Sequence, residues 1–116
     1  MKNITILLFC FLTISCFSQE KKSKSQKATI VVSGNCEHCQ MRITKTALSQ
    51  KGVKYASWDI PSNQLSLIYN ARKVDLIDIQ KAIAKSGHDT GKQKAPDTIY
   101  EQLPECCRYD RKSEKE

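Results

Sequence analysis

Two cysteines separated by two residues, Cys36 and Cys39, form the pattern with the clearest chemical meaning in this chain. A β-branched run, residues 28–33, precedes the pair, and a segment with helical apolar spacing, from about residue 39 to residue 51, begins at the second cysteine. At such a strand-to-helix junction, the N–H groups at the helix end favour the thiolate over the thiol. Two neighbouring thiolates suit soft-metal capture or thiol redox chemistry. The pair therefore limits the function to these two classes.

Copper is the soft metal that a two-thiolate site favours. Cu(I) accepts few ligands and soft sulfur donors, whereas Zn(II) prefers four ligands and would have open positions on two thiolates. The low coordination number also permits transfer, because a partner's thiolate can bind on the vacant side before the first donor leaves. Cu(I) is therefore the predicted ion, and Hg(II), Zn(II) and Cd(II) are the alternatives that titration separates.

A CxxC pair in an exported protein also serves as a redox pair or as a structural disulfide. The strand and helix signals after the pair do not resemble the thioredoxin fold, and neither Trp nor Pro flanks it. Paired carboxylates, a Ser/His/Asp set and a phosphate-binding loop are not evident in the sequence. The sequence therefore predicts a metal-binding protein that is not an enzyme. A thiol-disulfide oxidoreductase is the rival, and a purely structural or lipid-anchored interaction module is the third class.

Four further residues are candidate metal donors. His38 lies between the two cysteines, and His88 follows the second predicted helix, in a loop that the expected fold brings near the pair. Cys106 and Cys107 are neighbours, and because a vicinal disulfide is strained, we expect separate thiols or metal donors. If the C-terminal segment folds onto the CxxC loop, the four sulfurs suit Zn(II), a small Cu(I) cluster or a relay between the pairs. An accessory pair without contact to the site is the alternative.

The hydrophobic pattern predicts an α+β fold with four strands and two helices. The expected elements are, in chain order, a strand at 28–33, a helix at 39–51, strands at 53–60 and 65–69, a helix at 74–86 and a weaker strand within 88–95. Gly52 and Gly87 end the two helices. The order βαββαβ is the ferredoxin-like arrangement, a sandwich with both helices on one face of a four-stranded antiparallel sheet.

The residues around the cysteine pair resemble a known family, the heavy-metal-associated domain, over about residues 28–95. The similarity is carried by Ser33-Gly34-Asn35-Cys36-Glu37-His38-Cys39, the spacing of Ile43 and Ala47-Leu48, Gly52-Val53, and Ser86-Gly87-His88. That domain occurs in copper chaperones, in the N-terminal modules of copper-transporting ATPases and in periplasmic mercury-binding proteins. The resemblance implies that Cys36 and Cys39 are the metal ligands. It also implies a metal-transporting ATPase, an efflux component or a cuproprotein as the partner.

One feature departs from the family pattern. The family usually has Met-x-Cys at the start of the motif, with the methionine under the metal loop, whereas Asn35 immediately precedes Cys36 here. The apolar plug of the loop is therefore missing or replaced.

The ends of the chain differ in composition from its middle. Residues 1–18 have the layout of a signal peptide, and their apolar run is shorter than the ~20 residues that a membrane-spanning helix needs. A basic linker, residues 19–27, follows. The C-terminal extension, residues 96–116, carries the Cys-Cys pair and ends in a charged stretch, residues 110–116, that we expect to be disordered. The signal-peptide layout of residues 1–18 predicts an exported, periplasmic protein.

Cys16 leaves a second form of export open. Thr13-Ile14-Ser15-Cys16 loosely resembles a bacterial lipobox, with threonine in place of the usual leucine. Soluble release after Ser18 is favoured, and a membrane-anchored lipoprotein is the alternative, so we expect membrane contact only if Cys16 is lipidated. The formal net charge of +7 arises largely from lysines in the linker, among Ser and Gln. We therefore do not expect nucleic acid as a partner.

Overall fold

The computed structural model describes residues 25–111 of the chain. The predicted signal peptide, the lipidation site at Cys16 and residues 112–116 lie outside this described part. Within it, no helix combines the length and the apolar character that crossing a membrane requires.

Three strands form one antiparallel sheet in the order β1-β3-β2. They are β1 (Ser25–Val31), β2 (Val53–Trp58) and β3 (Gln64–Asn70). Leu67 of the central strand pairs with Ala28 on one side and with Ala56 on the other. Alternate side chains of β3 are buried, namely Leu65, Leu67 and Tyr69, because successive residues of a strand point to opposite faces. The predicted hairpin of the second and third strands is confirmed.

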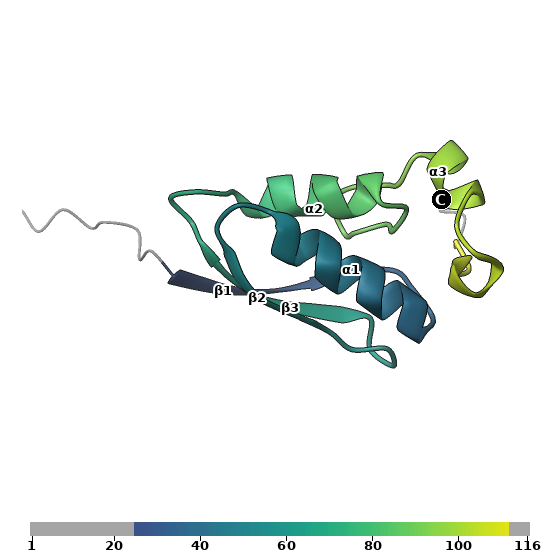
Figure 1. Ribbon diagram of the computed structural model, residues 1–116, viewed down its shortest axis with the longest axis horizontal. Coiled ribbons are helices and arrows are strands. Elements are labelled where there is room, and N and C mark those ends of the chain that lie inside the picture. The colour runs from purple at the N-terminus through teal and green to yellow at the C-terminus, as the bar shows by residue number, and fades with distance from the viewer. Residues whose placement is uncertain (1–24, 112–116) are drawn as a thin grey trace, which may run out of the picture.

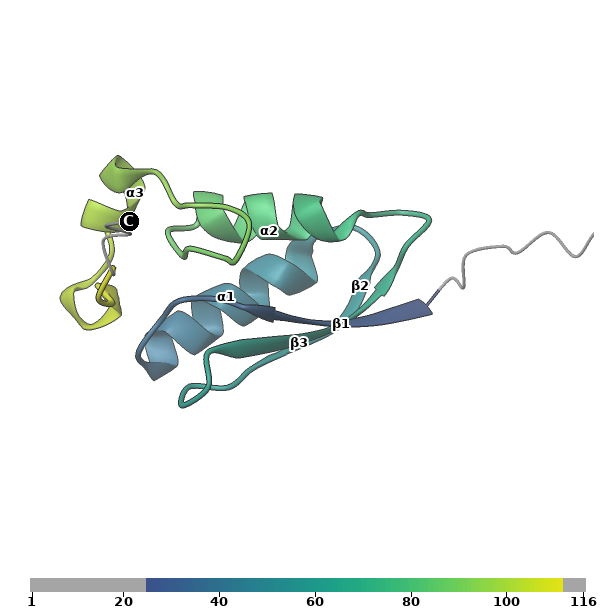
Figure 2. The ribbon, with the colours of Figure 1, turned by 180° about the vertical axis from the view of Figure 1, so that it is seen from behind.

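Two helices, α1 (Glu37–Ser49) and α2 (Leu76–Lys85), cover the same face of the sheet (Figures 1 and 2). Helix α1 buries Cys39, Ile43 and Ala47, which recur at every fourth residue and so form one stripe. Ile79 and Ile83 of α2 are buried by the same spacing. The core therefore lies between the helices and the sheet, and its stripe on α1 begins at a cysteine.

The predicted fourth strand within residues 88–95 is wrong for the described part of the chain. This segment makes one isolated bridge, between Thr90 and Val32, instead of a ladder. The carboxylate of Asp89 accepts a hydrogen bond from the Ala95 N–H at 2.7 Å, and the Thr90 N–H donates to the Gln93 carbonyl at 2.7 Å. Such local bonds compete with strand pairing and fold the segment into a turn. The sheet therefore has three strands rather than four.

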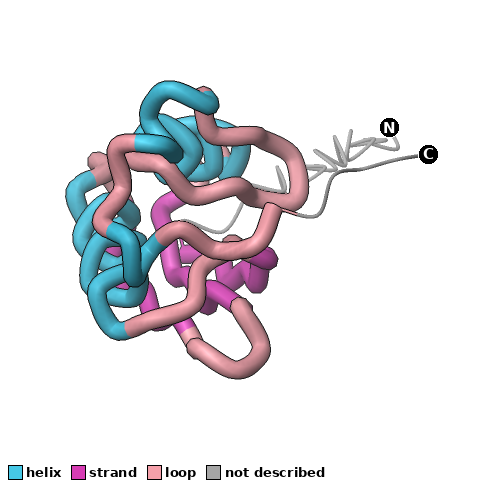
Figure 3. The backbone as a smooth tube through the Cα atoms, turned by 90° about the vertical axis from the view of Figure 1, so that its right-hand side faces the viewer, coloured by secondary structure: helices cyan, strands magenta, loops and turns pink. Residues whose placement is uncertain are grey.

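The C-terminal segment, residues 96–111, folds onto the end of the molecule where α1 begins (Figures 1 and 2). It contains the short helix α3 (Asp97–Glu101) and the 3-10 turn η1 (Glu105–Cys107). Figure 3 looks onto this end and shows loops and short helical turns in front of the strands. Leu103 and Tyr109 are buried in the same hydrophobic cluster as the sheet and helices. The segment is therefore part of the domain's core.

Candidate metal centre

Cys36 and Cys39 lie at the N-terminus of α1, as the sequence predicts. Cys36 is the N-cap residue with an extended backbone, and its side chain makes no capping hydrogen bond, so its sulfur is not used to hold the helix end. The two Sγ atoms lie 3.3 Å apart, and both thiols are free. Cys36 is half-buried, whereas Cys39 is fully buried against the core. One sulfur is thus accessible and the other is held by packing.

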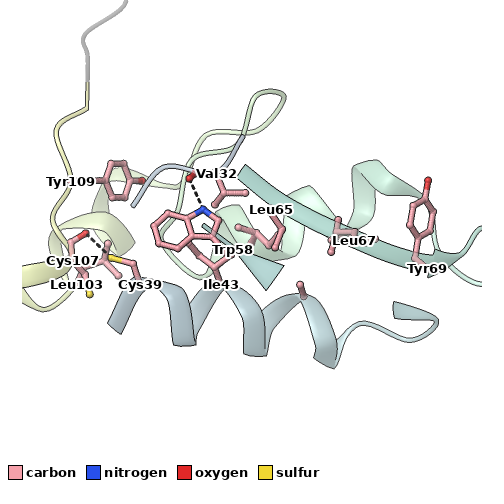
Figure 4. Close-up of a cluster of buried hydrophobic side chains, with 13 residues drawn as sticks. Val32, Cys39, Ile43, Trp58, Leu65, Leu67, Tyr69, Leu103, Cys107 and Tyr109 are labelled. Atoms are coloured by element: carbon pink, nitrogen blue, oxygen red, sulfur yellow. Dashed lines mark hydrogen bonds between the residues drawn. The ribbon is translucent and has the colours of Figure 1, made fainter. Parts of the chain in front are cut away.

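Trp58 fills the space under the metal loop. A Cβ atom at Gly34, which lies two residues before Cys36, would lie 2.9 Å from the Trp58 ring and 3.0 Å from the Cys39 Cβ. The indole is buried and its Nε1–H donates to the Val32 carbonyl at 3.0 Å (Figure 4). Gly34 occupies the methionine position of Met-x-Cys, so the apolar plug is replaced by a tryptophan from β2. No local pattern in the sequence links Trp58 to residue 34, so the sequence does not predict this contact.

The C-terminal segment brings a second pair of sulfurs to the first. The Cys107 Sγ lies 3.4 Å from the Cys36 Sγ. The Cys39 Sγ donates to the Cys107 carbonyl oxygen, 3.9 Å away (Figure 4). Cys106 is exposed, and its sulfur lies 3.8 Å from that of Cys107. The sulfurs of Cys36, Cys106 and Cys107 all lie within 4.8 Å of one another. These three sulfurs form one cluster, and Cys39 is linked to it through Cys36, whose sulfur is 3.3 Å away.

Tyr109 fixes the position of this segment. Its hydroxyl donates to the Gly87 carbonyl at 2.9 Å and accepts from the Asp89 N–H at 2.9 Å. A Cβ at Gly87 would lie 2.8 Å from a methyl group of Leu103, so only glycine permits this contact. Leu103 and Tyr109 are both buried. The loop after α2 and the C-terminal segment are therefore packed tightly together.

Arg111 adds a second anchor, although the sequence predicts disorder from residue 110. Its guanidinium pairs with Asp89 at 2.9 Å and with Asp97 at 2.6 Å, and it lies 4.3 Å above the Tyr100 ring. The Tyr100 hydroxyl donates to the Tyr109 carbonyl. The charged stretch thus begins as part of the folded domain. The available signal was Tyr109 between Arg108 and Arg111, directly before the charged end.

The two histidines occupy different environments. His88 is fully buried, and its Nδ1–H donates to the Ser33 carbonyl at 2.9 Å, while its Nε2 faces the Arg42 guanidinium at 3.4 Å. Burial lowers the pKa of His88, which keeps the ring neutral. Both ring nitrogens are thereby engaged, and the ring holds the chain just before the metal loop. His38 is exposed, and neither histidine belongs to the cluster of mutually close donors within residues 25–111.

The cysteine thiols differ in acidity. Burial acts to raise the pKa of Cys36, but hydrogen bonds from the Cys39 backbone and the neighbouring thiols outweigh it and lower the pKa to about 7. Burial, reinforced by the Cys36 and Cys107 thiols, raises the pKa of Cys39 to about 12. Desolvation and the same neighbouring sulfurs raise the pKa of Cys106 to about 11. Cys36 is therefore the most acidic of these three thiols.

Comparison with solved structures finds similar folds. A structure described as the CopZ metallochaperone has 26% sequence identity and a TM-score of 0.54, covering 56% of this chain and 98% of the other. The Cu(I)-loaded N-terminal domain of a potential copper-translocating P-type ATPase from Bacillus subtilis has 25% identity and a TM-score of 0.56, covering 65% and 95%. Oxidized MerP from Ralstonia metallidurans CH34 shares the fold at 24% identity and a TM-score of 0.56, covering 60% and 99%.

Comparison with curated proteins finds no match. The family comparison, in contrast, covers more than half of the chain. The model of the heavy-metal-associated domain matches residues 28–89, which include most of β1, the other two strands, both long helices, the CxxC loop and His88. With its Cys36 and Cys39 thiols side by side at the start of α1, this chain belongs to the heavy-metal-associated domain family.

Proposed function

We propose that this protein binds Cu(I) through Cys36 and Cys39 and passes it on by ligand exchange. The observation that carries the proposal is the 3.3 Å separation of two free thiols at the N-terminal end of α1. Soft thiolates select Cu(I) over hard ions, and a pair of them leaves room for an incoming ligand. The printed descriptions of the similar structures, a metallochaperone and a Cu(I)-loaded ATPase domain, support this choice of ion.

The different burial of the two cysteines supports an ordered exchange. Cys36 is half-buried and Cys39 is fully buried, so a partner's thiolate approaches the ion on the Cys36 side. A new sulfur–copper bond forms first, and then the bond to Cys36 breaks while Cys39 still holds the ion. Copper stays monovalent throughout and no substrate is converted to a product. The protein therefore acts as a carrier and not as an enzyme. A metal-transporting ATPase, an efflux component or a cuproprotein is the proposed recipient.

Anaerobic competition titration with a coloured Cu(I) chelator tests the proposal. The reduced chain is expected to remove one equivalent of Cu(I) from the chelator, and the Cys36→Ser and Cys39→Ser variants are expected to lose this affinity. Met41→Ala is the matched control, because Met41 is a soft donor on the same helix but is exposed on its surface. Parallel titrations with Hg(II), Zn(II) and Cd(II) rank the alternative ions. A chain that leaves all Cu(I) on the chelator contradicts the proposal.

The acidity of Cys36 supports a second candidate function, thiol-disulfide exchange. A thiol with a pKa of about 7 beside one with a pKa of about 12 resembles the attacking and buried thiols of redox pairs. An insulin-reduction assay with a reductant separates the two functions. A carrier is expected to show no turnover above the Cys36→Ser variant.

We also propose that the protein is exported to the periplasm, on the basis of the layout of residues 1–18. Mass spectrometry of the mature N-terminus distinguishes cleavage after Ser18 from lipidation of Cys16. A protein that still begins at Met1 and is found in the cell interior contradicts export.

A further inference from the structure

We propose that the C-terminal segment supplies thiolate ligands from Cys107 and Cys106 to the ion held by Cys36 and Cys39, and closes the site within one chain. This inference rests on the proposed function, since it concerns the same ion. It changes the character of the site: an open two-sulfur carrier becomes an enclosed site of three or four sulfurs.

The sulfur positions support more than two ligands. With metal–sulfur bonds of about 2.3 Å, two sulfurs lie about 4.6 Å apart in linear coordination, about 4.0 Å in trigonal and about 3.8 Å in tetrahedral coordination. The Cys36 sulfur lies 3.3 Å from that of Cys39 and 3.4 Å from that of Cys107, and the Cys106 and Cys107 sulfurs are 3.8 Å apart. Small shifts therefore bring Cys36, Cys106 and Cys107 to the trigonal spacing, whereas Cys39, which lies outside the set of sulfurs within 4.8 Å of one another, has to move further for a four-sulfur site. Linear coordination by Cys36 and Cys39 alone would need the larger separation of about 4.6 Å.

The second pair of sulfurs is held in place by packing. Cys107 is fully buried and belongs to the hydrophobic cluster that contains Cys39. On one side of the pair, Leu103 packs against Gly87, and on the other, the Tyr109 hydroxyl bonds to the backbone of the loop after α2. These contacts do not involve the sulfurs, so they orient Cys107 before any ion arrives. Preorganised ligands lose less conformational entropy on binding.

The chemistry balances without a redox partner. Each thiol that becomes a ligand forms one sulfur–metal bond and releases its proton to water, and the ion keeps its oxidation state. The exposed Cys106 lies on the solvent side of the cluster, whereas Cys39 and Cys107 lie on the core side. The two accessible sulfurs, Cys36 and Cys106, are thus the ones that an incoming thiolate reaches first.

A closed site has a consequence for transfer. The segment supplies the additional thiolates that a partner would otherwise provide, so partner and segment compete for the ion. Transfer then requires the segment to yield at least one sulfur. We infer that the segment lowers the rate of loss of the ion and delays its delivery to a thiolate-bearing partner.

Copper K-edge X-ray absorption on the full chain tests the inference. The starting protein carries Cys10→Ser and Cys16→Ser, so that only Cys36, Cys39, Cys106 and Cys107 remain. It is loaded anaerobically with less than one equivalent of Cu(I), and light scattering verifies that it is a monomer. Three or more sulfurs around each copper are expected, and because the CxxC pair has only two, a third must come from the C-terminal segment. Two sulfurs around copper in this monomer overturn the inference.

Variants on the same background locate the extra ligands. Cys106→Ser/Cys107→Ala is expected to reduce the count to two sulfurs, and Glu105→Gln, beside the pair but without sulfur chemistry, is expected to leave it unchanged. Hydrogen exchange at the Asp89 N–H, which donates to Tyr109, reports separately on whether the segment stays in place. An unchanged sulfur count in the double variant contradicts the inference. Failure of the proposed function looks different: the starting protein binds no Cu(I), or Cys36→Ser/Cys39→Ser binds it equally well.

Discussion

The Sγ of Cys36 lies 3.4 Å from the Sγ of Cys107, although 71 positions separate the two residues in the sequence. This contact joins the CxxC loop, which is the mark of the family, to a C-terminal segment outside the matched residues 28–89. Because Cys107 is also part of the hydrophobic core, the segment and the metal loop are mechanically linked.

Removal of the second sulfur pair is expected to weaken Cu(I) binding. Cys106→Ser/Cys107→Ala should raise the Kd by at least about tenfold, equal to about 1.4 kcal/mol, because thiolate ligands are lost. The same variant should deliver Cu(I) faster to a thiol-bearing acceptor. Competition titration and stopped-flow transfer measure the two effects, and Glu105→Gln is the control. Equal affinity and equal transfer rate in the variant count against a ligand role for the segment.

Gly34→Ala is expected to destabilise the fold by about 1–3 kcal/mol, because its Cβ would overlap a buried ring. The distance to the Trp58 ring would be 2.9 Å, and the Cys39 Cβ would lie at 3.0 Å, so neither neighbour can easily give way. Urea unfolding measures the effect. Gly91→Ala is the matched control, since nothing lies within 4 Å of a Cβ at that position. If the two alanine variants have the same stability, the close packing of Trp58 under the loop is wrong.

Alkylation of the reduced chain is expected to depend on pH through Cys36. Its pKa is lowered to about 7, so the thiolate fraction and the rate should be small below pH 7 and rise to a plateau above it. Cys39, with its pKa raised to about 12, should stay unmodified over the same range. Iodoacetamide labelling followed by mass spectrometry identifies the modified residue. The Cys36→Ser variant should lose this pH-dependent labelling. A labelling rate of the unchanged chain that rises with an inflection near pH 9 would argue against the lowered pKa of Cys36.

The buried His88 is expected to make stability fall in acid. Its pKa is lowered by burial from the usual 6.5, while Arg42 also disfavours the charge and the Ser33 carbonyl and Asp89 favour it. The unfolded chain therefore binds a proton at a pH where the folded chain does not, and the stability is lost as pH falls below about 6.5. A single titrating group changes the free energy of unfolding by at most about 1.4 kcal/mol per pH unit.

Urea unfolding between pH 5 and 8 measures this dependence. His88→Gln is expected to show a shallower slope than the unchanged chain below pH 6.5, whatever its stability at pH 8. Parallel curves for the two proteins would mean that His88 does not carry the acid sensitivity.

Tyr109→Phe is expected to loosen the C-terminal segment. The change removes the hydroxyl that bonds to Gly87 and Asp89, and it leaves a backbone N–H without its partner, at a cost of about 1–3 kcal/mol. Hydrogen exchange at the Asp89 N–H should become faster. Tyr55→Phe is the control, because Tyr55 is 49% exposed and lies on β2, away from the segment. Unchanged exchange at Asp89 would show that the hydroxyl does not hold the segment.

Local patterns were sufficient for most of the fold. The alternation of Leu65, Leu67 and Tyr69 predicts a half-buried strand, and the spacing of Cys39, Ile43 and Ala47 predicts a helix that faces the sheet, because both periodicities are properties of a single element. The expected strand at 88–95 failed because Asp89 and Thr90 bond to their own turn, and such bonds compete with the ladder.

The sequence by itself determined that two thiols stand together at a strand-to-helix junction, since Cys36 and Cys39 are neighbours in any helix that begins there. It also raised the question of whether Cys106 and Cys107 approach them, and it could not decide it. Only the tertiary structure decided that Cys107 reaches Cys36 and that Trp58 fills the place under Gly34. These contacts join residues far apart in the chain, and they depend on the packing of Leu103 and Tyr109 against the loop after α2, which no periodicity within one element encodes.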